Sequence, residues 1–191
     1  MSLLFPNKET KGSGSMAKKL LLFVVILVSF FLVSCKGGKN MKISSVFRDG
    51  EFIPEKYTCN GKNINPPLTV TNIPTGAKTI AVIMDDPDAP GKTFVHWVLW
   101  NLDVNGDEVK IDEGLSRDAS CCEQGLNDFG NIGYDGPCPP QGHGVHHYHI
   151  KVYALDTKLN LPPKATKKDL EDAMKGHILS HVELMGLFER K

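Results

Sequence analysis

The sequence predicts a mainly β domain in which a few helices pack against a β-sandwich. Short runs of strand-forming residues are separated by clusters of Gly, Pro, Asn and Asp, as is typical of strands joined by turns. Helical spacing of apolar residues is confined to the C-terminal part of the chain. The sequence after residue 41 has no internal repeat, which indicates one fold rather than an array of units.

The first 34 residues are predicted to be an N-terminal extension and a signal peptide, outside the fold. Lys18 and Lys19 precede an apolar run over residues 20–33, and a small residue leads to Cys35, which is the order of parts in a secretion signal. The segment Leu-Val-Ser-Cys resembles a bacterial lipobox, and this resemblance implies acylation of Cys35. A retained membrane anchor is the weaker alternative, because the run is shorter than the ~20 residues that span a bilayer. The expected location is the bacterial cell envelope, where the exported protein is anchored as a lipoprotein.

The rest of the chain is predicted to be a short spacer followed by one domain. Residues 35–41 form the acylated Cys and its spacer, and residues 42–191 are long enough for a single hydrophobic core. The chain carries 22 Lys and Arg and 22 Asp and Glu, so its formal net charge is zero. Because the sequence shows no basic stripe, we do not expect a nucleic-acid partner.

Strand-like runs follow one another along this domain. Weak runs lie at residues 42–47 and 69–70, and longer ones at residues 79–84, 94–102 and 146–155. The unbroken apolar character of residues 80–84 predicts a strand that is covered on both faces.

A helix is expected near the C-terminus. Thr166 and Asp169 have the spacing of a capping box, which marks the start of a helix. The residues that then follow at helical spacing are Leu170, Ala173, Met174, His177, Ile178 and His181.

Alternation along the strands predicts which polar side chains meet the core. His146 and Tyr148 share a face with Ile150, whereas His147 and His149 share the opposite face. On the earlier strand, the same alternation aligns His96 with Val98 and Trp100.

Two proline-rich loops carry the polar groups of a candidate site. The loop over residues 85–90 precedes His96, and the loop over residues 136–142 precedes His146 and Tyr148. Stiff backbone that presents imidazole, phenol and carboxylate groups is typical of a small preformed pocket for an oxyanion. Seen alone, Asp-Pro-Asp is more often an ordinary turn and a lone His more often a structural residue, so the prediction depends on both loops together.

The motifs in and around these loops resemble the phosphatidylethanolamine-binding protein family, in particular its bacterial Raf-kinase-inhibitor-like branch. They are Asp-Pro-Asp-Ala-Pro with His-Trp, Gly-Pro-Cys-Pro-Pro with Gly142, His-x-Tyr, and Val-Tyr-Ala-Leu-Asp, and further matches extend over residues 42–190. The resemblance implies a central antiparallel β-sandwich with a few peripheral helices and an anion pocket at one end. Carried over to this sequence, it implies a ligand-binding set made of Asp86, Asp88, His96, Gly136, Pro137, His146 and Tyr148.

Physical chemistry suggests how such a set binds an anion. An Asp carboxylate repels an anion, so we expect Asp86 or Asp88 to accept a hydrogen bond from a His and to favour imidazolium. The imidazolium, the Tyr148 hydroxyl and backbone N–H groups near Gly136 then donate to the ligand. The bond between Ala89 and Pro90 is a candidate cis peptide. One departure from the family pattern is His147, which replaces the usual Arg and affects the rim of the pocket.

The cysteines leave several pairings open. Besides Cys35, the chain has Cys59, Cys121, Cys122 and Cys138, an even number in an exported protein. Adjacent cysteines seldom bond to each other, so we expect Cys121 or Cys122 to pair with one of the other two. Free buried thiols are the alternative.

The favoured function is binding of a phosphate-type head group or small anion, without catalysis and without a cofactor. The resemblance also implies a second possibility, inhibition or regulation of a protease or kinase target, and a possible homodimer. A metal site is a further alternative, because His143, His146, His147 and His149 are close in sequence, but alternation splits them between two faces. Hydrolysis is another, although the sequence shows no nucleophile motif.

Overall fold

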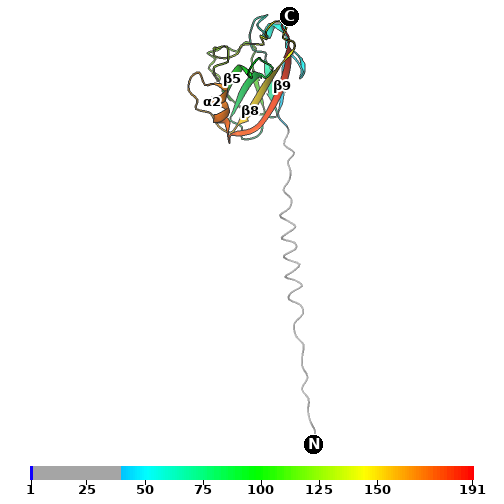
Figure 1. Cartoon of the computed structure of the whole chain (residues 1–191). Helices are drawn as coiled ribbons and strands as arrows, with labels where there is room; N and C mark the ends of the chain where they lie inside the picture. The colour runs from blue at the N-terminus through cyan, green and yellow to red at the C-terminus, as the bar shows by residue number, and fades with distance from the viewer. Residues whose placement is uncertain (2–39) are drawn as a thin grey trace. The chain divides into compact units, whose positions relative to one another are not determined.

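The described part of the protein is a sandwich of two β-sheets with one short α-helix on the outside (Figure 1). The computed structural model describes residues 40–191, and the statements below refer to them. One sheet has three strands in the order β1-β3-β6, and the other has six in the order β2-β9-β8-β4-β5-β7. The elements are β1 (Lys42–Ser44), β2 (Glu51–Phe52), the 3-10 helix η1 (Glu55–Tyr57), β3 (Leu68–Thr71), β4 (Thr79–Asp86), β5 (Phe94–Asp103), β6 (Glu108–Ile111), β7 (Glu123–Gln124), β8 (His146–Leu155), α2 (Lys167–Met174) and β9 (Ile178–Phe188).

The predicted mainly β fold is confirmed. All strand pairs are antiparallel except β2 with β9, which is parallel. The predicted signal segment and Cys35 lie outside the described residues. Within residues 40–191, no helix is long and apolar enough to cross a membrane.

Strand β4 lies inside the six-stranded sheet, between β8 and β5, and all eight of its residues are buried. Ile80, Val82 and Met84 belong to the core that also contains residues of β3 and β6 in the three-stranded sheet. Ala81 and Ile83 belong to a second core that is closed by α2. The prediction of a strand covered on both faces is therefore confirmed, because one sheet and one helix each cover a face.

Strand β8 has the predicted alternation. His146, Tyr148 and Ile150 are buried, whereas His147 is exposed and His149 half-buried. One neighbour of β8 is β4 and the other is β9, with which it pairs along its whole length (Figure 1). This double pairing fixes the position of the His and Tyr side chains at the start of β8.

The expected C-terminal helix is correct only in its first part. The capping box of Thr166 and Asp169 is present, and both of its hydrogen bonds are made. The helix α2 ends at Met174, however, and Gly176 follows with a φ of +82°, a left-handed conformation that favours glycine. Of the other residues in the predicted pattern, His177 lies in the turn, and Ile178 and His181 belong to strand β9. The alternate members Leu184, Gly186 and Phe188 of this strand are buried. Pairing with β8 outweighs the helical spacing of the residues around His177 and His181.

Strand β5 contains an irregularity that changes the expected direction of His96. The register between β4 and β5 shifts between Met84 and Asp85, so that β5 has an extra residue at this point. The ring of His96 lies 5.2 Å from that of Tyr148, on the inner side of the sheet, whereas Val98 and Trp100 pack on the outer side. The predicted alignment of His96 with these two residues is therefore wrong, since a bulge reverses the alternation.

Candidate functional site

A cavity of about 270 Å³ opens at one end of the six-stranded sheet, where β4 ends and where β5 and β8 begin. The loops after β4 and before β8 form its sides, so both proline-rich loops contribute to it. Four of the predicted site residues reach it together, from three strands. The lining residues are Asp86, Ala89, Pro90, Phe94, His96, Phe129, Cys138, Pro139, Pro140, His146 and Tyr148.

A chain of three side chains leads from the cavity wall to the surface. Nδ1 of His146 lies 2.7 Å from Oδ2 of Asp86, and both side chains are buried. An ionised carboxylate accepts hydrogen bonds, so His146 donates here. Nε2 of His146 lies 2.7 Å from Nδ1 of His143, which is exposed. The other oxygen of Asp86 accepts from the backbone N–H of Asp88 at 2.8 Å, which ties the loop after β4 to the same carboxylate.

Tyr148 provides the most unusual polar group of the cavity. Its hydroxyl oxygen is buried and has no hydrogen-bond partner among the described residues. Burial raises the pKa of this hydroxyl well above its ordinary value, and so does Asp86, whose carboxylate lies near the hydroxyl without meeting hydrogen-bond geometry, so the hydroxyl remains a donor. Such an unpaired buried group is rare in proteins, because it costs free energy that a partner would recover.

The imidazole of His96 is held in one tautomer by the backbone. Its Nδ1 lies 2.8 Å from the carbonyl oxygen of Asp135, and a carbonyl only accepts, so Nδ1 carries the proton. Burial lowers the pKa of His96 below its ordinary value, because the charged form is poorly solvated inside the protein. The expectation of an imidazolium therefore does not hold for His96, which is neutral at neutral pH.

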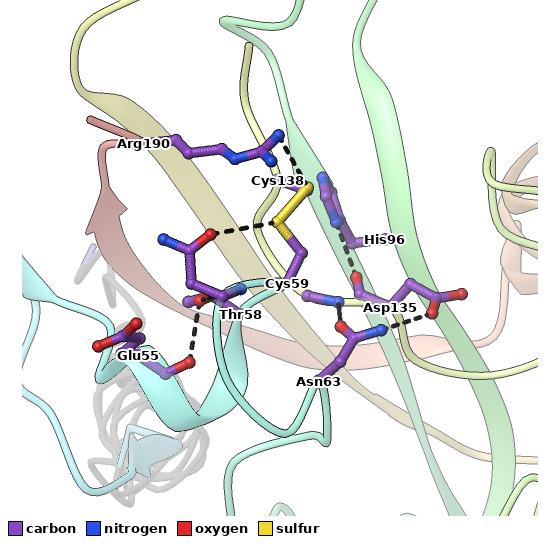
Figure 2. The surroundings of a disulfide bond; sticks show 10 residues. Glu55, Thr58, Cys59, Asn63, His96, Asp135, Cys138 and Arg190 are labelled. Carbon is purple, nitrogen blue, oxygen red and sulfur yellow. Dashed lines mark hydrogen bonds between the residues drawn. A yellow bond between two sulfur atoms is a disulfide. The ribbon is translucent and has the colours of Figure 1, made fainter. Parts of the chain in front are cut away.

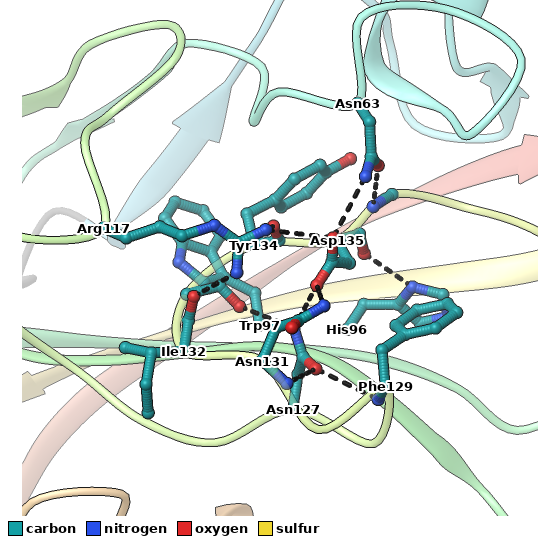
Figure 3. A network of polar contacts seen from close by, with 12 residues as sticks. Asn63, His96, Trp97, Arg117, Asn127, Phe129, Asn131, Ile132, Tyr134 and Asp135 are labelled. Carbon is teal, nitrogen blue, oxygen red and sulfur yellow. Dashed lines mark hydrogen bonds and ion pairs between the residues drawn. The ribbon is translucent and has the colours of Figure 1, made fainter.

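The backbone beneath His96 is fixed by a polar network centred on Asp135 (Figure 3). One oxygen of its carboxylate accepts from Asn63 at 3.0 Å and from Arg117 at 3.0 Å, and the other accepts from Asn127 at 2.7 Å and Asn131 at 3.0 Å. Burial alone raises the pKa of Asp135, but these hydrogen bonds and the Arg117 charge outweigh it and lower the pKa. A fully engaged carboxylate of this kind positions the segment that holds His96.

Gly136 and Pro137 lie behind the cavity and do not line it. The N–H of Gly136 itself donates to Oδ1 of Asn63 at 2.7 Å, so it is already occupied within the protein, and the expectation that backbone N–H groups near Gly136 donate to a ligand stays a prediction for its neighbours. A Cβ at residue 136 would lie 2.1 Å from the carbonyl oxygen of Tyr57, which explains why glycine is needed there. The carbonyl of Pro137 accepts from the N–H of Cys59 at 3.1 Å. Both residues thus hold the loop in place.

Asp88 also lies outside the cavity lining. Its Oδ2 accepts from Nδ1 of His147 at 2.6 Å and from the backbone N–H of His147 at 2.8 Å. Hydrogen bonding to His147 lowers the pKa of the Asp88 carboxyl. The pair is about half exposed, so Asp88 and His147 form a rim contact between the two loops.

A disulfide joins Cys59 to Cys138 beside the cavity (Figure 2). Cys121 and Cys122 are free, so the expected pairing of one of them with Cys59 or Cys138 is wrong. The loop around Cys138 is brought to Cys59 by the backbone bond from Cys59 to Pro137, which sets the correct partner. Arg190 donates to Sγ of Cys138 at 3.8 Å from the other side.

The bond between Ala89 and Pro90, a candidate cis peptide, is trans, because the described residues contain no cis bond. The tight turn is made instead by the hydrogen bond from the N–H of Asp88 to Asp86. X–Pro bonds are trans by default, and this side-chain contact makes an exception unnecessary.

Sequence reasoning missed the apolar walls of the cavity. The rings of Phe94 and Phe129 lie 4.8 Å apart, and each lies within 5.4 Å of the ring of His96. Phe94 precedes His96 by two residues on one strand, so alternation alone would have placed it on the same face. Phe129 comes from a distant loop, and no local pattern indicates it.

The structure does not support the alternative of a metal site in the described part of the chain. Within residues 40–191, no group of three or more His, Cys, Asp and Glu side chains is placed to hold a metal ion. His147 and His149 bond instead to Asp88 and Glu183, on the face opposite His146.

Comparison with known proteins identifies the class to which this fold and cavity belong. A family profile described as "phosphatidylethanolamine-binding protein" matches residues 43–189. The chain is similar to a UPF0098 protein of Pyrococcus horikoshii, with 48% identity over 189 residues that cover 94% of each chain. The protein therefore belongs to the phosphatidylethanolamine-binding protein family.

Two crystal structures have the same fold. The first is a putative phosphatidylethanolamine-binding protein homologue from Chlamydia trachomatis, with a TM-score of 0.71 and 38% identity, covering 80% of this chain and 99% of that one. The second is Escherichia coli YbcL, described as a new member of the mammalian family, with a TM-score of 0.73 and 28% identity, covering 80% of this chain and all of that one.

Proposed function

We propose that this protein is an exported, lipid-anchored envelope protein whose cavity binds a phosphate-type head group or a related small anion without catalysing a reaction. The observation that carries the proposal is the buried Tyr148 hydroxyl, a donor without a partner in a preformed cavity. A ligand oxygen at this position would satisfy the hydroxyl. Hydrogen bonds to charged groups contribute about 1.5–3 kcal/mol each, which makes this a substantial part of the binding energy of a small ligand.

The size and walls of the cavity support a small ligand with an apolar part. At about 270 Å³, the cavity is near the lower limit of small-molecule sites. Phe94, Phe129 and three prolines supply much of its surface. A compact phosphate ester, with an oxyanion at one end and a short carbon chain at the other, fits this division. The name of the family points to phosphoethanolamine as the first compound to test.

The carboxylate of Asp86 is the main electrostatic obstacle to an anion in this cavity. Asp86 contributes a negative charge to the wall, and His96 is neutral, so an anion would be repelled unless a positive charge lies nearby. His146 donates to Asp86 and also contacts His143, so the Asp86 carboxylate is turned toward an imidazole N–H rather than toward the ligand. The neutral His96 adds an acceptor, which suits a ligand that carries a P–OH group.

The absence of catalysis is supported by the chemistry of the cavity. Among the described residues, those that line it include no Ser, Thr, Lys or free Cys, and the sulfur of Cys138 is engaged in the disulfide. None of the Ser, Thr, Lys or Cys nucleophiles of covalent catalysis is therefore placed to attack a bound ester. The disulfide also supports export, because such bonds persist mainly outside the cytoplasm. The anchor itself rests on the sequence around Cys35, and Cys35→Ala should move the protein from the membrane to the soluble fraction.

Titration calorimetry with O-phosphoethanolamine, and with inorganic phosphate as a second probe, tests the ligand class. Tyr148→Phe removes only the hydroxyl and should weaken binding about 10- to 100-fold. Tyr153→Phe is the matched control, since Tyr153 lies on the outer face of β8 against His181 and should bind like the wild type. Failure of the wild type to bind either compound, or equal affinity of the two variants, would contradict the proposal.

A further inference from the structure

Two cysteines outside the anion cavity form a second candidate site. Cys121 and Cys122 lie in the turn before β7, and their Sγ atoms are 3.5 Å apart. Successive side chains of an extended strand point to opposite faces, so it is the turn that brings both sulfurs to one side. Cys121 is exposed and Cys122 is half-buried, and both are reduced.

Covalent geometry disfavours a disulfide between Cys121 and Cys122. The Cα atoms of adjacent residues are about 3.8 Å apart across a trans peptide, whereas disulfides usually join Cα atoms about 4.4–6.8 Å apart. The other two described cysteines, Cys59 and Cys138, are already joined at a Cα separation of 5.4 Å. A dithiol therefore remains available in a protein that has formed its disulfide.

The surroundings of the pair suit a soft, thiophilic centre. The two cysteines line a hollow of about 260 Å³ together with Asp103, Glu123 and Lys158, and Lys158 already pairs with Asp103 at 2.8 Å, so the carboxylate of Glu123 is the charge left beside the sulfurs. Burial, with the neighbouring Cys121 and Glu123, raises the pKa of Cys122 to about 12, so this residue is a thiol at neutral pH. A soft ion binds thiolate sulfur strongly enough to displace such protons.

We propose that Cys121 and Cys122 together bind a soft, thiophilic ion of low coordination number, of the class to which trivalent arsenic belongs. A closed zinc site needs four ligands, and no group of three or more is assembled anywhere in residues 40–191. An ion that is satisfied by two thiolates needs only the pair that is present. With an arsenoxide, two As–S bonds replace the two S–H bonds, and the arsenic-bound oxygen leaves with both protons as water.

Phenylarsine oxide, which forms a stable product only with two neighbouring thiols, is the probe. The full chain should gain one phenylarsenic group by intact mass spectrometry, and this adduct should survive an excess of monothiol and be removed by a small dithiol. Cys121→Ser and Cys122→Ser should each lose the stable adduct. Peptide mapping of the labelled wild type should place the group on residues 121–122, with the bond between Cys59 and Cys138 intact.

Three results would overturn the proposal. They are the absence of an adduct on the wild type, an adduct that survives either Ser substitution, and a native disulfide between Cys121 and Cys122 in the purified protein. Peptide mapping needs no variant, so it decides the matter even if a substitution disturbs folding.

Discussion

Asp86 and His146 form a buried counterpart of the exposed pair made by Asp88 and His147. The carboxylate-to-Nδ1 distance is 2.7 Å in the first pair and 2.6 Å in the second. The side chains of the first pair are 2–3% exposed, and those of the second are 42–47% exposed. Both pairs connect the loop after β4 to the start of β8. The same contact therefore occurs twice in one molecule, in two dielectric environments.

Removal of the two carboxylates should have unequal effects on stability. Asp86→Ala leaves the buried N–H of His146 without an acceptor and also removes the acceptor of the partly exposed Asp88 N–H, and should lower the free energy of unfolding by about 2–3 kcal/mol. Asp88→Ala breaks a solvent-screened pair and should cost about 1 kcal/mol or less. Urea unfolding of both variants measures the difference. Equal losses would show that the first pair is not buried in solution.

The hydroxyl groups of two buried tyrosines should also differ in their contribution to stability. Tyr148→Phe removes a hydroxyl that has no partner, so the free energy of unfolding should stay the same or rise by about 1 kcal/mol. Tyr134→Phe removes a hydroxyl that donates to the carbonyl of Tyr57 at 2.6 Å, and should lower it by about 1–2 kcal/mol. Thermal and urea unfolding without added ligand make the comparison. A clear loss in Tyr148→Phe would mean that its hydroxyl is already bonded.

Much of the sheet could be predicted from local patterns. Strand β8 is buried on one face and has alternating apolar residues, whereas β4 is buried on both faces and has a continuous apolar run. The start of strand β9 could not be predicted in this way. The helical spacing of Leu170 and Met174 in α2 continues by chance into Ile178, which belongs to the strand. The left-handed Gly176 was the local signal that the helix ends.

The site was predictable to the extent that it depends on strand ends. Asp86, His146 and Tyr148 meet because β4 and β8 are neighbours in the sheet. The direction of His96 was not predictable, because it depends on a bulge that arises from pairing with a distant strand. The partner of Cys138 and the hydrogen bonds of Asp135 were not predictable either, because they depend on contacts between loops that are remote in sequence.

The disulfide beside the cavity should contribute strongly to stability. Cys59 and Cys138 are 79 residues apart, and closing a loop of this length restricts the unfolded chain enough to contribute about 4 kcal/mol. The double variant with Ala at both positions should lose about this amount in urea unfolding. The matched control is the double variant with Ser at Cys121 and Cys122, which are free, and it should lose less than about 1 kcal/mol. Similar losses in the two variants would contradict the pairing.

The pKa of His96 predicts how stability changes with pH. Burial lowers the pKa of His96 in the folded protein, whereas in the unfolded chain it is about 6.5. Between these two values the unfolded chain binds more protons, so stability must fall as the pH falls below about 6.5 and must be fully present above it. His96→Asn retains a donor for the carbonyl of Asp135 but cannot take up this proton.

The difference between the wild type and His96→Asn isolates this contribution from that of the other histidines. Urea unfolding at pH 8 and at pH 5 should show a larger loss of stability in the wild type than in the variant. A buried imidazole that became charged in the folded state would lack its solvation, and this is the physical cause of the extra loss. Equal losses over this pH range would mean that His96 takes up its proton as readily in the folded protein as in the unfolded chain, and would restore an imidazolium at His96 as a candidate anion ligand.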